Sequence, residues 1–142
     1  MKKMIKIFLI ILLVTNLYKC EKAAMDKKYA VYLTNNAEHS IGCYFGLGGE
    51  FGTLYPDTTL PTTNQYVVTE IKFGTRYIYD SGLKWEEIYS KLPKDTMSVY
   101  IFHTDTLKQE SWEDIRNSYK ILKRYDLSLD DLKQNNWAIT YP

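Results

Sequence analysis

His103 and Asp105 are the residues whose types and spacing best suit acid–base chemistry. They lie two positions apart at the end of an apolar run, and on a strand this spacing places both side chains on one face. With Ser98 or Thr96 on a neighbouring position, such a set would suit a small hydrolase. A histidine that ends a strand more often caps the following turn, so we predict no catalytic residue and keep the hydrolase as a less favoured hypothesis.

Adjacent carboxylates occur at Glu86 and Glu87 and again at Asp130 and Asp131. Neighbours on a helix point about 100° apart, so neither pair resembles the facing carboxylates of a glycosidase. The acidic residues that follow Asp126 lack the glycine and the final glutamate of a calcium-binding EF-hand loop. Their expected role is to place negative charge at helix N-termini.

The sequence contains no complete pattern for a metal or a cofactor. His39 and Cys43 are four residues apart without a second ligand pair nearby, whereas zinc sites normally need four ligands. The glycine-rich stretch 46–52 has Phe51 where a dinucleotide-binding loop needs its third glycine, and the P-loop pattern is absent. We therefore predict no metal and no cofactor.

Aromatic residues are abundant, with 13 tyrosines, five phenylalanines and three tryptophans. Strand propensity accounts for most of them. The remainder suit a recognition surface, since tyrosine and tryptophan combine an apolar ring with a polar group. Trp85, Trp112 and Trp137 could form a sugar-stacking platform, and the alternatives are Tyr55, Tyr66, Tyr77 and Tyr79. The predicted binding rim, centred on the long glycine-rich loop, comprises Gly46, Gly48, Gly49, Tyr55 and Trp137.

The charge balance changes once the first 20 residues are set aside. The whole chain has 18 Lys and Arg against 17 Asp and Glu, and four of the basic residues and none of the acidic ones precede Cys20. The remainder thus carries 14 basic and 17 acidic residues, a net charge of −3. Nucleic-acid binding normally requires clustered Lys and Arg, so we predict no nucleic-acid partner.

Six or seven short strands are predicted, over residues 29–34, 41–45, 65–71, 75–79, 96–103, 120–125 and 137–141. The stretch 119–127 also fits a helix, and a strand over 120–125 is the preferred interpretation. Turn-forming residues at 35–40 predict that the second strand runs back along the first. Gly74 interrupts 65–79, which predicts either a hairpin or one bent strand with a bulge. The stretch 96–103 has the strongest strand pattern and is expected to be central.

Short helices are expected between these strands. Apolar residues at Trp85, Ile88, Tyr89 and Leu92 share one face of a helix over residues 84–92. Capping patterns predict two more helices, at 111–114 with Trp112 and Ile115 facing inward and at 128–131 before Leu132. The prediction is a mainly β (α+β) fold, an antiparallel β-sandwich-like single domain over residues 29–142 with two or three short helices.

The first 20 residues predict a signal peptide. Lys2, Lys3 and Lys6 precede the apolar run 7–14, which is the pattern of an export signal. A helix that crosses a bilayer needs about 20 apolar residues, and this run is much shorter. Residues 17–20, Leu-Tyr-Lys-Cys, resemble a lipobox, although that motif prefers small residues at its two middle positions. We expect Cys20 to be the lipidated residue and 21–28 to be a polar tether.

Two alternatives to lipidation at Cys20 remain. An ordinary signal peptidase needs small residues at the first and third positions before its cut. A cut after Ala24 has Lys22 at the third position, and a cut after Ala23 has Glu21, so both are poor. The other alternative is an uncleaved amphipathic anchor.

Cys43 is the second of the two cysteines, and its expected role depends on Cys20. If Cys20 carries lipid, Cys43 is expected to be a small buried hydrophobe. If Cys20 stays attached without lipid, a disulfide between Cys20 and Cys43 is the alternative in an oxidising compartment.

The C-terminal third, at residues 111–116, 125–132 and 137–142, resembles a recurrent tail of small exported proteins from Bacteroidetes. The stretches 46–56 and 103–107 are similar to them too. Those proteins are uncharacterised and often lipoprotein-like. The resemblance implies export, and it implies no activity and no functional residues.

The sequence thus predicts an exported cell-envelope domain anchored to a bacterial membrane, on its periplasmic or surface face. The favoured function is a binding or accessory module for a glycan or an envelope protein, without enzymatic activity. The alternative is a structural or assembly subunit of a surface appendage, which would present an exposed sheet edge.

Overall fold

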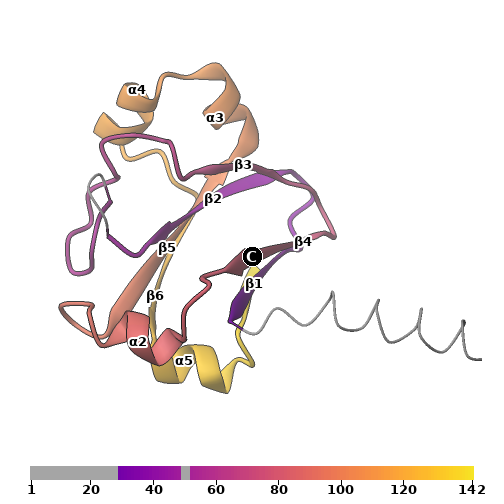
Figure 1. The fold of residues 1–142 in the computed structure, drawn as a ribbon. Helices are drawn as coiled ribbons and strands as arrows, with labels where there is room; N and C mark the ends of the chain where they lie inside the picture. The colour runs from indigo at the N-terminus through magenta and orange to yellow at the C-terminus, as the bar shows by residue number, and fades with distance from the viewer. Residues whose placement is uncertain (1–28, 49–51) are drawn as a thin grey trace, which may run out of the picture.

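The computed structural model describes residues 29–48 and 52–142, and within them seven strands form two sheets (Figure 1). One sheet has three strands in the order β4-β1-β7, and the other has four in the order β3-β2-β5-β6. The strands are β1 Ala30–Asn35, β2 Ile41–Gly46, β3 Val68–Ile71, β4 Arg76–Asp80, β5 Thr96–His103, β6 Lys123–Ser128 and β7 Ala138–Tyr141. The predicted fold class, a β-rich and sandwich-like α+β domain, is confirmed.

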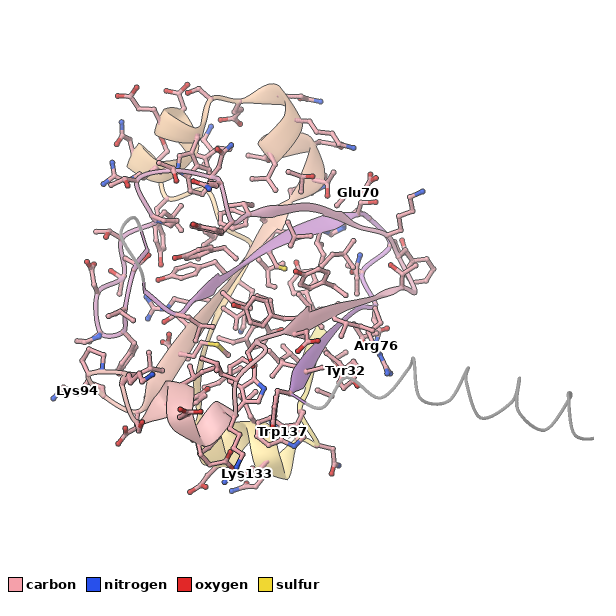
Figure 2. All side chains as sticks on the ribbon, viewed as in Figure 1. Tyr32, Glu70, Arg76, Lys94, Lys133 and Trp137 are labelled. Atoms are coloured by element: carbon pink, nitrogen blue, oxygen red, sulfur yellow. The ribbon has the colours of Figure 1, made fainter. Side chains whose placement is uncertain are left out.

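The four-stranded sheet is antiparallel throughout, and β5 lies inside it between β2 and β6, as its sequence pattern predicts. In the three-stranded sheet β1 is antiparallel to β4 but parallel to β7. The sheet faces enclose one core, in which Val31 and Leu33 of β1 oppose Ile41 and Cys43 of β2. Figure 2 shows side chains filling the space between the sheets.

The predicted return of the second strand along the first is wrong, because β1 and β2 belong to different sheets. Both strands carry apolar side chains that must reach the same core, and an arch between sheets lets these faces oppose each other across it. The buried Asn35 at the end of β1 holds the arch. Its amide nitrogen donates hydrogen bonds to the carbonyl oxygens of His39 (2.8 Å) and Ile71 (2.9 Å), and its amide oxygen accepts one from the Ala37 N–H (2.9 Å).

The predictions for residues 65–79 are also wrong in their pairing. β3 pairs with β2 and β4 pairs with β1, so this stretch is neither a hairpin nor one bent strand. The chain passes from one sheet to the other through Gly74, which has a positive φ of 70° and forms a backbone hydrogen bond to the Asn35 carbonyl. Glycine adopts this conformation without steric cost. The two arches therefore meet at Asn35.

Four short helices lie in the described part of the chain, namely α2 Trp85–Tyr89, α3 Thr104–Gln109, α4 Trp112–Asn117 and α5 Leu129–Gln134. Side-chain caps at Ser111 and Ser128 begin α4 and α5, as predicted, and Ser128 forms a complete capping box with Asp131. The helix not predicted is α3. It has one large apolar residue, Leu107, and therefore no apolar period to detect.

The long loop and α4 cover the outer face of the four-stranded sheet, whereas α2 and α5 bury Trp85, Tyr89 and Leu132 in the core between the sheets. Tyr44, Tyr100 and Phe102 on that face form a second cluster with Leu60 of the loop and Ile115 of α4. Figure 1 shows α3 and α4 together at one end of the molecule, and α2 and α5 at the other. The central strands β2 and β5 are thus buried on both faces. The interior of the sandwich is accessible on the side between β3 and β4.

Candidate binding groove

A groove of about 420 Å³ opens between the edge strands β3 and β4, one from each sheet. We call it the aromatic groove. Its described lining comprises Tyr44, Phe45, Leu47, Gly48, Gln65, Tyr66, Val67, Val68, Tyr77 and Tyr79. Five of these ten residues are aromatic, and three of them, Tyr66, Tyr77 and Tyr79, are exposed or half-buried.

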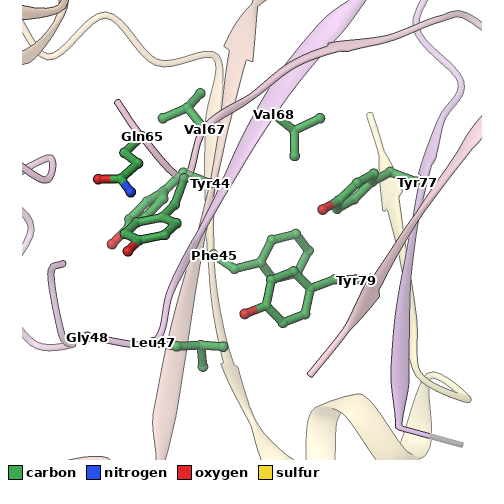
Figure 3. A pocket seen from close by; sticks show the side chains of 10 residues that line it. Tyr44, Phe45, Leu47, Gly48, Gln65, Val67, Val68, Tyr77 and Tyr79 are labelled. Atoms are coloured by element: carbon green, nitrogen blue, oxygen red, sulfur yellow. The ribbon is translucent and has the colours of Figure 1, made fainter. Parts of the chain in front are cut away.

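The alternation of β4 supplies two of the rings. Tyr77 and Tyr79 are half-buried and face inward, while Arg76, Ile78 and Asp80 are exposed. Phe45, near the end of β2, is buried at the groove, and its ring stacks on Tyr79 with a centroid distance of 4.5 Å and an interplanar angle of 22° (Figure 3). Stacking in the core fixes these rings before any ligand arrives.

The opposite wall comes from the segment before β3 and from β2. Tyr66 is 64% exposed, the highest value among the large hydrophobic residues that line the groove. Gln65 beside it is also exposed and offers an amide. Tyr44 is buried, and its hydroxyl accepts a hydrogen bond from the Thr53 N–H at 3.2 Å. This wall therefore contains the fixed ring of Tyr44 and the accessible ring of Tyr66.

The groove carries no charge at neutral pH among its described lining residues, none of which is Asp, Glu, Lys, Arg or His. Desolvation by burial raises the pKa of Tyr77 and Tyr79 above the ordinary value of 10.0. Both phenols therefore stay protonated and keep a hydroxyl donor. Apolar rings, tyrosine hydroxyls and one amide are the groups available to a ligand.

The structure places the predicted rim residues in several environments. Gly48 lines the aromatic groove with a positive φ of 80°, and a Cβ there would approach the Leu54 side chain to 2.9 Å. Gly46 is instead buried at the end of β2. Gly49 lies outside the described residues. Gly48 is therefore the predicted rim glycine that the structure places in the lining of the groove.

Tyr55 and Trp137, the aromatic members of the predicted rim, are not among the residues that line the groove. Tyr55 is partly buried in the long loop. Trp137 is half-buried against the core, with its ring centroid 6.3 Å from that of Trp85. Trp85 itself is buried, and its indole N–H donates to the Tyr29 carbonyl at 3.1 Å.

Three of the four alternative tyrosines, Tyr66, Tyr77 and Tyr79, do come together in the groove. Sequence reasoning missed Tyr44, Phe45 and Gln65. The sequence does indicate that Phe45 faces the core, since strand alternation places it on the same face as the apolar Cys43. No local signal shows that this face lies opposite β4, because the arch between the sheets decides that.

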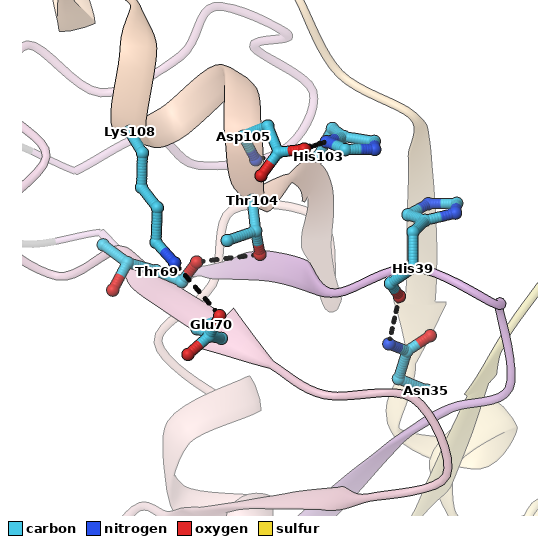
Figure 4. A network of polar contacts seen from close by, with 8 residues as sticks. All are labelled: Asn35, His39, Thr69, Glu70, His103, Thr104, Asp105 and Lys108. Atoms are coloured by element: carbon cyan, nitrogen blue, oxygen red, sulfur yellow. Dashed lines mark hydrogen bonds and ion pairs between the residues drawn. The ribbon is translucent and has the colours of Figure 1, made fainter.

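His103 acts as a helix cap. Its Nδ1 accepts the backbone N–H of Asp105 at 3.1 Å, and the Asp105 carboxylate lies 3.8 Å from the same nitrogen. Figure 4 shows this corner, where the His39 ring stacks on His103 with centroids 4.7 Å apart. The Ser98 hydroxyl donates to Asp126 at 2.6 Å. We therefore assign His103 and Asp105 to the beginning of α3.

Contacts around α3 hold it to β3, next to the aromatic groove. The Thr104 hydroxyl donates to the Thr69 carbonyl at 3.0 Å, and Lys108 forms an ion pair with Glu70 at 3.0 Å (Figure 4). The hydrogen bond from Lys108 lowers the pKa of Glu70. Both side chains are exposed, and exposed ion pairs contribute little to stability. These contacts therefore hold β3 in place at the edge of the aromatic groove.

Cys43 is fully buried with a free thiol, as expected for a small core hydrophobe, and burial raises its pKa far above the ordinary value. Cys20 lies outside the described residues. Within residues 29–48 and 52–142, no three His, Cys, Asp or Glu side chains are grouped so that they could hold a metal ion. No helix of this described part has the length and apolarity needed to cross a membrane.

Comparisons with protein-family models, with curated proteins and with solved structures found no match to this chain.

Proposed function

We propose that this protein is an exported cell-envelope binding module that holds a glycan in the aromatic groove. The observation that carries the proposal is the meeting of Tyr66, Tyr77 and Tyr79 with Phe45 in one uncharged groove between two sheet edges. Its volume of about 420 Å³ lies within the range of small-molecule sites, which is roughly 300–1,000 Å³.

Glycan chemistry matches these groups. The C–H face of a sugar ring packs on an aromatic face, and its hydroxyls need hydrogen-bond partners that an apolar pocket lacks. Tyr66 offers an exposed ring face, while the Tyr77 and Tyr79 hydroxyls and the Gln65 amide offer donors and acceptors. An uncharged groove suits a ligand whose binding groups are hydroxyls.

Export and anchoring enter the proposal from the sequence. Lys2, Lys3 and Lys6 before the apolar run 7–14 support export, and the lipobox-like residues 17–20 support a lipid on Cys20. The likeness to small exported proteins of Bacteroidetes points the same way. The intact mass of protein extracted from membranes tests this part, since a lipidated chain that begins at Cys20 has a distinct mass.

Tyr66→Ala is expected to weaken glycan binding by about fivefold or more, because an aromatic anchor at a binding site commonly contributes above 1 kcal/mol. Folding should be little affected, since this ring is 64% exposed. Affinity for an oligosaccharide selected from a glycan array, measured by calorimetry, checks the expectation.

Phe73→Ala is the matched control for Tyr66→Ala. Phe73 is also an exposed aromatic residue, at 60%, but it does not line the groove. Its removal should leave affinity unchanged. Equal losses in the two variants, or no array glycan whose binding depends on Tyr66, would contradict a glycan site in the aromatic groove.

A further inference from the structure

A second hollow of about 270 Å³ continues the aromatic groove towards α2. The two hollows share Leu47, Gly48 and Tyr79 in their lining, so they form one elongated groove with two halves. Leucine and isoleucine side chains dominate the second half, which we call the aliphatic hollow. Its further lining includes Leu54, Leu83, Ile88, Lys91 and Leu92.

The aliphatic hollow differs from the aromatic groove in what it can bind. Leu83 is 49% exposed although it is large and apolar, and Ile88 is half-buried beside it. Such a surface gains free energy when an apolar group covers it, and it offers few partners to a sugar hydroxyl. A ligand that continues from the aromatic groove should therefore carry an apolar substituent at this point.

Lys91 supplies the one charge among the described residues that line the two halves. Within the described part of the chain Lys91 has no ion pair, whereas Lys108 and Lys133 lie 3.0 Å and 3.1 Å from carboxylate oxygens. An ammonium group at the rim of an apolar hollow attracts an anionic group and repels a cationic one. The charge of the elongated groove thus complements a carboxylate.

We infer that the ligand is an oligosaccharide that carries both N-acyl groups and a carboxylate. Its sugar rings would lie on Tyr66 and Tyr79, an acetamido methyl group would enter the aliphatic hollow, and the carboxylate would face Lys91. This inference rests on the proposed function and specifies the class of glycan. Charge complementarity at Lys91, together with the exposed Leu83, distinguishes this ligand from a neutral, unsubstituted glycan.

The test uses matched pairs of N-acetylated oligosaccharides, each with a free carboxylate or with the same carboxylate as its methyl ester. The free acid is expected to bind up to about fivefold more tightly, which is the upper end of the range for an exposed ion pair. In Lys91→Gln the advantage should disappear, and the affinity for the ester should stay unchanged. The advantage should also shrink as salt is added.

Lys94→Gln is the control, because Lys94 is an exposed lysine three residues further along the chain that lines neither half. It should retain the preference for the free acid. Equal affinities for acid and ester, or a preference that persists in Lys91→Gln, would overturn the inference while Tyr66-dependent glycan binding still stands. Binding of acidic peptides in place of every oligosaccharide would overturn both.

Discussion

Asn35→Asp is expected to destabilise the protein by about 3–5 kcal/mol, the range for an uncompensated buried charge. The Asn35 amide nitrogen donates to two carbonyl oxygens, those of His39 and Ile71, and the side chain is fully buried. A carboxylate of the same shape would place negative oxygen against both carbonyls. Urea denaturation followed by tryptophan fluorescence measures the loss.

The stability of Asn35→Asp should depend on pH in a defined direction. Burial against carbonyl oxygens raises the pKa of the new carboxyl in the folded state above its unfolded value. A raised folded pKa means that stability is highest below the unfolded pKa and is lost as pH rises through the folded one. The variant should therefore recover part of its stability in acid.

Asn36→Asp is the matched control, since Asn36 is exposed in the same turn. It should change the free energy of unfolding by less than about 0.5 kcal/mol, as most surface substitutions do. If Asn35→Asp unfolds at the same urea concentration as Asn36→Asp, the two arches do not depend on the Asn35 amide.

Gly42→Ala is the second large effect, with an expected loss of about 1–3 kcal/mol from overpacking. A Cβ on Gly42 would lie 2.3 Å from the Leu107 Cδ1 and 2.6 Å from the Val68 carbonyl oxygen. Leu107 belongs to α3, and Val68 is the first residue of β3. The added methyl must therefore displace the Leu107 side chain and move β3 relative to β2, and Val68 lines the aromatic groove.

A double variant identifies which contact matters. Leu107→Ala removes the side-chain contact with the new methyl but leaves the Val68 carbonyl in place. Gly42→Ala combined with Leu107→Ala should therefore recover only part of the loss, and a double-mutant cycle measures the coupling. Unfolding of Gly42→Ala at the same urea concentration as the parent protein would contradict the close packing of α3 and β3 on β2.

Local sequence patterns predict most elements of this fold. Residues 96–103 are a central strand as expected, because a long run of β-branched and aromatic residues suits a strand buried on both faces. Ser111 and Ser128 begin helices as expected, because a hydroxyl that accepts a backbone N–H is a short-range interaction. The sixth strand begins at Lys123 instead of residue 120.

Strand pairing could not be predicted in the same way. The turn at 35–40 has the composition of a hairpin, yet β1 and β2 separate because their apolar faces oppose each other across the core. The same holds for β3 and β4 on either side of Gly74. Which strands form arches depends on long-range burial, and no window of a few residues contains that information.

The sequence predicts which types of residue form the candidate site, but it does not predict which of them the fold brings together. Tyr66, Tyr77 and Tyr79 stand out as recognition tyrosines from the sequence, and Gly48 marks one wall. Phe45 joins them only because the arches bring β2 and β4 to the same opening. Trp137, which looked equally suitable, packs against Trp85. Topology thus selects which aromatic residues form the groove.

The measurement that tests the aromatic groove most directly is a backbone amide NMR titration of the protein with a carboxylated, N-acetylated oligosaccharide. We expect saturable shifts centred on Val67, Val68, Tyr77 and Tyr79, with smaller ones near Lys91. Shifts centred on the His39 and His103 corner would contradict this site. Shifts along Arg76–Asp80 that depend on protein concentration without the sugar would instead indicate assembly through the β4 edge.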